Sequence, residues 1–75
     1  MNREYIQTLL DTRPFVPFTV YMSSGQFHNV RYPGCAILTP TRMVITDPDA
    51  DHIVVVSLFH IVKVEMLQPA QPAAS

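Results

Sequence analysis

The sequence contains few of the residues that stabilise or mark most small domains. It has one cysteine, Cys35, which excludes an internal disulfide, and its cysteine and histidines lack the spacing of a structural zinc site. It has no tryptophan and only two glycines, too few for a glycine-rich loop that cradles phosphate. Five Lys and Arg stand against six Asp and Glu, so no basic excess attracts nucleic acid. With 48% hydrophobic and 15% charged residues, the chain has more apolar surface than a monomer of 75 residues hides easily.

Signals for export and for membrane insertion are also missing from the sequence. The first residues, MNREYIQTLLDTRP, carry charges where a signal peptide would be apolar. No apolar stretch approaches the length of a membrane span. We therefore expect a cytoplasmic protein with a reduced thiol and no membrane contact.

What is present is a long apolar run from Ile53 to Val64, IVVVSLFHIVKV. Such a run is typical of a strand that is buried on both faces. A chain this short buries only ~60% of its unfolded surface and has few other elements with which to cover the run. We therefore expect barrel closure and a second copy of the chain to supply the cover, since an exposed apolar edge must be paired or covered. The candidate contact residues are Ile53, Val55, Phe59 and Ile61.

The remaining pattern indicates one domain over residues 1–67. An apolar stripe at helical spacing predicts a helix over residues 2–11, and the proline at position 14 ends it. Alternating residues with a Ser24-Gly25 turn predict a hairpin over residues 18–32. Further strands are predicted at 36–38 and 42–46, a helical turn at 57–60, and a disordered tail at 68–75. The expected fold is mainly β: a small, strongly bent SH3-like or Sm-like barrel of about five antiparallel strands with one N-terminal helix.

Residues that could support metal binding or catalysis do not form a recognisable motif. Residues 47–51, DPDAD, begin like a calcium loop, but His52 and Leu58 stand where that loop needs glycine and glutamate. Cys35 has no nearby basic group to lower its pKa and activate it. We therefore expect no metal, no cofactor and no catalytic residue, and predict that the protein is not an enzyme.

Aromatic and basic residues leave contact with single-stranded nucleic acid open. Tyr21, Phe27, Tyr32 and Phe59 would stack on bases if they were exposed. Core packing is the simpler expectation for Phe27 and Phe59. His60 lies where the terminal strand is expected to bend, a position that can place a side chain at a pore or at a subunit contact.

Two segments resemble motifs of the Sm-like superfamily, with the bacterial RNA chaperone of that superfamily as the nearest layout. FTVYMSSGQFHNV at 18–30 resembles its first motif, an alternating strand that leads into a turn glycine, here Gly25. SLFHIVKV at 57–64 resembles its second bacterial motif, and His60 falls on the motif histidine, whereas Phe59 stands where the family has lysine. The resemblance implies a homo-oligomeric ring that binds single-stranded RNA, for which the candidate residues are His60, Tyr21 and Arg31.

A second resemblance is to short bacterial proteins of unknown function that begin with Arg-Pro-Phe-x-Pro-Phe. RPFVPF at 13–18 and VKVEML at 62–67 match that pattern, which brings no activity with it. The sequence therefore leaves two main hypotheses: a homo-oligomeric module that binds RNA, and a protein-interaction or scaffolding module that does not. A hydrolase that uses Cys35 with a histidine is a third alternative, for which the sequence shows no recognisable pair of nucleophile and base.

Overall fold

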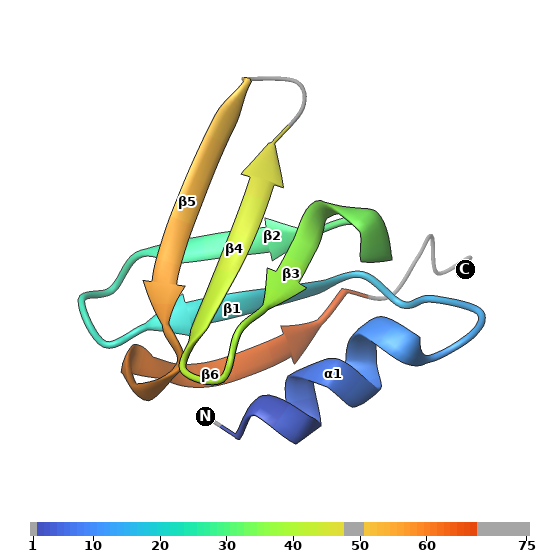
Figure 1. The fold of residues 1–75 in the computed structure, drawn as a ribbon, viewed down its shortest axis with the longest axis horizontal. Helices are drawn as coiled ribbons and strands as arrows, with labels where there is room; N and C mark the ends of the chain where they lie inside the picture. Colours follow the sequence, from blue (N-terminus) through green and yellow to red (C-terminus); the bar gives the residue numbers. More distant parts are fainter. Residues whose placement is uncertain (1, 48–50, 68–75) are drawn as a thin grey trace.

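The computed structural model describes residues 2–47 and 51–67 and contains one helix, six strands and two short 3-10 turns (Figure 1). The centre of the DPDAD loop and the predicted tail at 68–75 lie outside the described residues. The elements in chain order are α1 (Arg3–Asp11), β1 (Phe18–Met22), β2 (Phe27–Val30), η1 (Pro33–Cys35), β3 (Ala36–Leu38), β4 (Arg42–Asp47), β5 (His52–Ser57), η2 (Leu58–His60) and β6 (Ile61–Met66).

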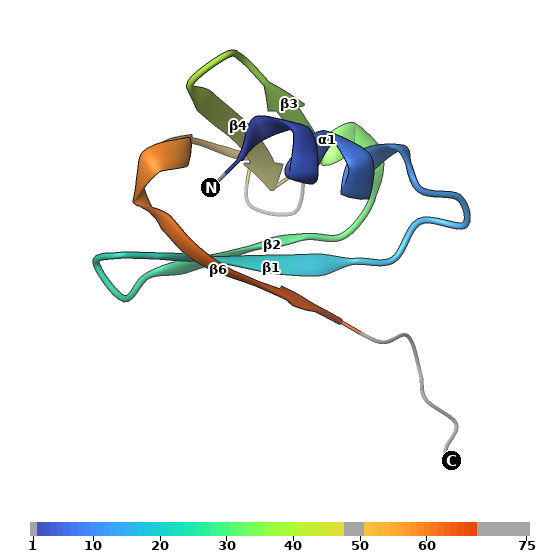
Figure 2. The ribbon, with the colours of Figure 1, turned by 90° about the horizontal axis from the view of Figure 1, so that it is seen from below.

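The strands form two antiparallel sheets of three strands each. Sheet A has the order β2-β1-β6, and sheet B has the order β3-β4-β5. Figure 2 shows the two sheets as separate layers, and the chain passes between them at two corners, through η1 and through η2. The mainly β class with one N-terminal helix is confirmed. Among the described residues no strand of one sheet pairs with a strand of the other, so the sheets are not closed into the expected barrel.

Local chemistry explains where α1 begins and what it covers. The Asn2 side chain accepts hydrogen bonds from the backbone N–H groups of Glu4 and Tyr5 at 2.6 and 3.3 Å, which satisfies two donors that the first helical turn leaves free. Ile6 and Leu10 are one turn apart, are both buried, and join the core that the two sheets share. The helix, which contacts β3, therefore lies across one end of the space between the sheets (Figures 1 and 2).

The β1–β2 hairpin forms at the predicted turn. The Gly25 N–H donates to the Met22 carbonyl, and Gly25 adopts φ 94°, a left-handed conformation that costs glycine little. Val30 pairs with Phe18 and both side chains are fully buried, so this face of the hairpin is the core face. Phe27 consequently projects from the opposite face of sheet A.

Two aromatic residues that we expected in the core lie at the surface instead. Phe27 is 57% exposed because it pairs with Tyr21 on the outer face of sheet A. Phe59 is 79% exposed, since η2 turns its neighbour Leu58 into the core. The core is built mainly from aliphatic side chains, and its largest fully buried members are Phe18, Ile6, Met43, Val20 and Val30.

The long apolar run is covered on one side only. Val56, Leu58 and Ile61 face the core and are at most 8% exposed. Other residues of the run project outward, and η2 divides the run into β5 and β6 instead of one continuous strand. The outward residues are Ile53, Val55, Phe59 and Val62, and each is more than half exposed. The chain therefore supplies one layer of cover for this segment, and the other face remains open.

Candidate interaction surfaces

The outer face of sheet B is apolar across all three of its strands. The register aligns Ile37 of β3 with Val44 of β4 and Val44 with Val55 of β5, so that these three side chains form a row across the sheet. Ile53 follows two positions from Val55 on the same face. We call these four residues the sheet B face. Ile37, Val55 and Ile53 are 63%, 58% and 65% exposed, a cluster of hydrocarbon that water meets directly.

The outer face of sheet A carries polar side chains that bind one another, beside the exposed Phe27 ring. Thr19 Oγ1 donates a hydrogen bond to Asn29 Oδ1 at 2.7 Å, and the Tyr21 hydroxyl donates to Glu65 Oε1 at 2.8 Å. The Lys63 ammonium lies 4.5 Å from the centre of the Tyr21 ring, as in a cation–π contact. These contacts between neighbouring strands stabilise the sheet.

The hydrogen bond to Glu65 also alters the acidity of Tyr21. The carboxylate accepts the phenol proton as a hydrogen bond, and together with partial burial and the nearby negative charge it raises the pKa of Tyr21 above 10.0. Tyr21 therefore remains a neutral donor to Glu65 over the physiological range. Its hydroxyl and the ring face near Lys63 are both occupied within the chain.

The three residues predicted to bind RNA do not form one site. Tyr21 lies on the outer face of sheet A, whereas His60 lies in η2 at one end of β1, where its carbonyl accepts from the Ser23 N–H at 2.7 Å. Arg31 follows Val30, which pairs with Phe18 at the opposite end of β1. A strand of five residues spans about 15 Å, so the length of β1 separates Arg31 from His60.

The four predicted oligomer-contact residues also lie in different environments. Ile53 and Val55 belong to the sheet B face, and Phe59 is the most exposed large apolar residue among those described. Ile61 is only 3% exposed, because it pairs with Met22 and faces the core. Ile61 therefore stabilises the subunit itself and is not part of an exposed surface.

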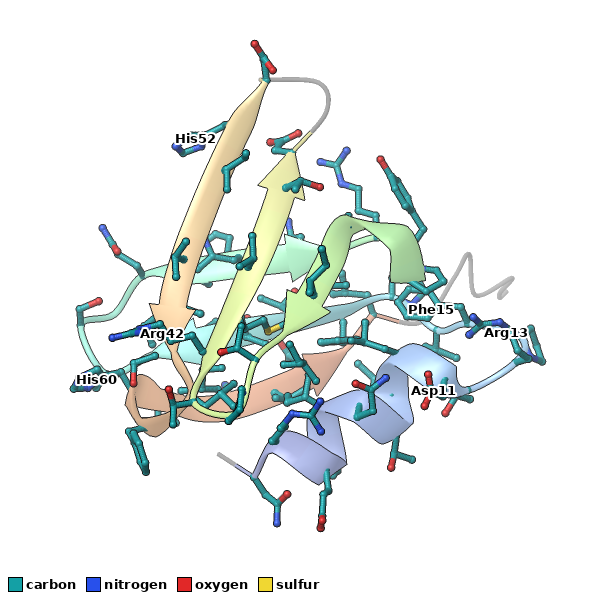
Figure 3. The ribbon with its side chains drawn as sticks, in the orientation of Figure 1. Asp11, Arg13, Phe15, Arg42, His52 and His60 are labelled. Atoms are coloured by element: carbon teal, nitrogen blue, oxygen red, sulfur yellow. The ribbon has the colours of Figure 1, made fainter. Side chains whose placement is uncertain are left out.

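A corner at one end of the molecule gathers exposed aromatic and basic side chains. Figure 3 shows His60 and Arg42 at the same end, on the side of the lower end of β5. The backbone keeps these segments together, since the Leu58 N–H donates to the Thr41 carbonyl at 2.9 Å. With Phe59 beside His60 in η2, this corner presents a ring and two nitrogen-bearing side chains to solvent.

A pocket of about 320 Å³ lies where β2 faces the inner side of the β4–β5 hairpin. His28 of β2 and His52 of β5 both line it, as does the buried Cys35. Sequence spacing did not reveal this grouping, because the two histidines lie far apart in the chain and only the packing of the two sheets brings them to one pocket. No group of three or more His, Cys, Asp or Glu within residues 2–47 and 51–67 is arranged to hold a metal ion.

No helix formed by the described residues is long and apolar enough to cross a membrane. No protein-family model matches the chain, and it has no significant match among curated proteins or among solved structures. The two resemblances noted in the sequence therefore stay predictions.

Proposed function

We propose that this chain is a non-enzymatic interaction module that works as a homo-oligomer, with the sheet B face buried between subunits. The observation that carries the proposal is the contrast between the two outer faces. The outer face of sheet A joins its own side chains by two hydrogen bonds and a cation–π contact and exposes the ring of Phe27, whereas Ile37, Ile53 and Val55 of sheet B present mainly hydrocarbon. Burial of apolar area is the main favourable term in most protein association.

The edge of β5 supports the same proposal. The hydrogen bond from the Leu58 N–H to the Thr41 carbonyl makes Arg42 and Ser57 a pair without mutual backbone hydrogen bonds. The alternation of an antiparallel ladder then directs the peptide groups of Ile53 and Val55 away from β4. An edge strand with free peptide groups and apolar side chains is a template for pairing with another chain.

We further propose that the two sheets and their corners are a partly open barrel of the SH3-like or Sm-like kind, in a cytoplasmic protein. The shared core and the 3-10 turn between β5 and β6 support the barrel. The single cysteine, which is buried and has no disulfide partner in the sequence, supports the reducing compartment.

Light scattering of the purified protein over a range of concentrations tests the proposal. We expect an oligomer whose mass is insensitive to salt, since apolar contacts are not screened by ions as charge contacts are. A monomer at every concentration and salt condition would refute self-association.

Binding of single-stranded RNA is the second candidate function, and the corner at η2 favours it. Phe59 is exposed and offers a ring for stacking, while His60 and Arg42 provide hydrogen-bond donors for phosphate. The net charge of −1 weighs against strong binding, because affinity for nucleic acid depends largely on neutralised phosphates. Repeating the light scattering with a uridine-rich oligonucleotide at low and high salt separates the candidates. An oligomer that ignores the oligonucleotide even at low salt leaves only the protein-interaction function.

A further inference from the structure

The pocket between β2 and the β4–β5 hairpin lies at the free β2 edge of sheet A. In Figure 1 the hairpin crosses β2 and continues beyond it. The inner side chains of that overhanging part, which include His52 and Val54, therefore face the pocket instead of another strand of sheet A. From the other side the pocket is lined by β2, with His28 on the inner face of that strand. One more strand beside β2 would fill the space.

The backbone of β2 directs peptide groups outward, where such a strand could pair with them. The Met22 N–H donates to the Gln26 carbonyl, so Tyr21 and Phe27 form a pair without mutual backbone hydrogen bonds. The peptide groups of Phe27 and Asn29 consequently point away from β1, toward the free edge. Both residues line the pocket at that edge. They present alternating donors and acceptors, the arrangement that an extended peptide recognises.

We propose that the edge of β2 binds an extended peptide segment of a partner protein, which adds a fourth strand to sheet A and places an acidic side chain between His28 and His52. In the added strand the residue opposite His28 points inward, into the pocket. Imidazole N–H groups donate to a carboxylate in either protonation state, because even the neutral ring has one donor. Arg31 and Asp47 also line the pocket and offset each other in charge.

The outward side chains of the added strand define the rest of the motif. One neighbour of the acidic residue lies beside Phe27, whose ring is 57% exposed, and the other lies beside Asn29. An apolar residue suits the position beside Phe27. The segment recognised is therefore an acidic residue with an apolar neighbour, in extended conformation.

Nucleic acid fits this edge less well than a peptide. The carbonyls of Phe27 and Asn29 need donors, whereas phosphate groups offer only acceptors and the donors of RNA, its 2′-hydroxyls and bases, do not repeat at the spacing of a strand. A peptide supplies both kinds of group at the strand repeat. This surface is also distinct from the sheet B face, so peptide binding and self-association can succeed or fail separately.

The test is a titration of the ¹⁵N-labelled protein, followed by NMR, with the capped peptide STVEVTS. This probe places glutamate at the central inward position and valine on both sides of it. We expect the amide signals of Phe27 and Asn29 to shift and their exchange with D2O to slow at saturation. The matched peptide with lysine in place of glutamate is expected to bind at least about tenfold more weakly, because it lacks the carboxylate that accepts hydrogen bonds from the imidazoles. Equal binding of both peptides, or no binding of either, would overturn the proposal.

Two substitutions of Asn29 distinguish the contribution of its backbone N–H to peptide binding from that of its side chain. Asn29→Ala loses the contact with Thr19 but keeps the outward N–H, so it should bind the peptide within about threefold of the original protein. Asn29→Pro removes that N–H as well, a change that edge strands tolerate, and should weaken binding at least about tenfold. Equal affinities of the two folded variants would exclude strand addition. If Asn29→Pro does not fold, slowed exchange at Phe27 and Asn29 in the original protein decides the question.

Loss of the imidazoles tests the other half of the proposal. His52→Gln should reduce the preference for the glutamate peptide over the lysine peptide at least about tenfold. The mass measured by light scattering should not change, because His52 is not part of the sheet B face. A preference that survives both His28→Gln and His52→Gln would refute the acidic specificity. A change in mass without a change in peptide binding would instead count against the separation of the two surfaces.

Discussion

Placing a charge on the sheet B face is the most direct perturbation of self-association. We consider Val55→Asp, because Val55 is 58% exposed and lies at the end of the row that crosses the sheet. In the free subunit the new carboxylate faces water, so stability should change by no more than about 0.5 kcal/mol. In the oligomer the same carboxylate would be buried against hydrocarbon without a partner, which is costly.

The exposed fractions of the apolar side chains on the sheet B face determine how much free energy their burial contributes to association. Ile37, Ile53 and Val55 together retain the exposure of about two complete side chains, and burying them is worth roughly 3–6 kcal/mol per subunit. Two such faces gain roughly 6–12 kcal/mol, against an association cost of about 4–15 kcal/mol. The expected affinity is therefore moderate. A buried unpaired carboxylate that costs roughly 3 kcal/mol weakens association about a hundredfold or more.

Sedimentation equilibrium or light scattering at about 5–500 µM covers the range in which such an affinity is visible. We expect the original protein to associate and Val55→Asp to remain monomeric. Asn29→Asp is the matched control: it adds the same charge to the outer face of sheet A and keeps an oxygen that accepts from Thr19. If Val55→Asp retains the original mass, or if the control dissociates equally, the sheet B face is not the contact.

Three further predictions concern the subunit itself. Ile6→Ala should lower the free energy of unfolding, measured in urea, by about 2–5 kcal/mol, because Ile6 is fully buried between α1 and the sheets; a loss below about 0.5 kcal/mol would mean that the helix is not part of the core. Asn2→Ala should cost about 1 kcal/mol in the same assay and Asn2→Asp much less, since aspartate also caps the helix; equal losses would contradict the cap. The pKa of Tyr21 is raised above 10.0, so the stability that this shift contributes is complete below pH 10 and is lost as the pH rises through the pKa of the folded state. Glu65→Gln should lower that pKa toward 10.0 in a tyrosinate absorbance titration, with Tyr21→Phe identifying the signal, and an unchanged curve would refute the assignment to Glu65.

Local signals in the sequence were sufficient for most of the elements. The stripe that contains Ile6, the proline after the helix, and Gly25 at the hairpin turn act within a few residues, and the structure confirms α1 and the β1–β2 hairpin. The bend predicted at 57–60 is also confirmed, as η2. These elements depend on helix capping, proline geometry and turn conformation, which the neighbouring residues determine.

The environments of individual side chains were harder to predict, because they depend on register. Phe27 and Val30 occupy opposite faces of β2, and only the pairing of Val30 with Phe18 decides which face is inner. The run at 53–64 looked equally apolar on both sides, but only the side that carries Val56, Leu58 and Ile61 faces the core. The grouping of His28 with His52 arises from the packing of two separate hairpins, which no local spacing encodes.

The two outer faces show how one core can serve two different surfaces. On sheet A many of the outward side chains of β1, β2 and β6 bind one another, and the Phe27 ring and the outward peptide groups of β2 are available to a partner. On sheet B the outward residues of the row are Ile37, Val44 and Val55, and burying their apolar side chains away from water is favourable. A charge on sheet B should therefore abolish association and leave peptide binding intact, whereas Asn29→Pro should do the reverse. If either change removed both properties, the two surfaces would be one interface, and the separation of their chemistry would not correspond to a separation of function.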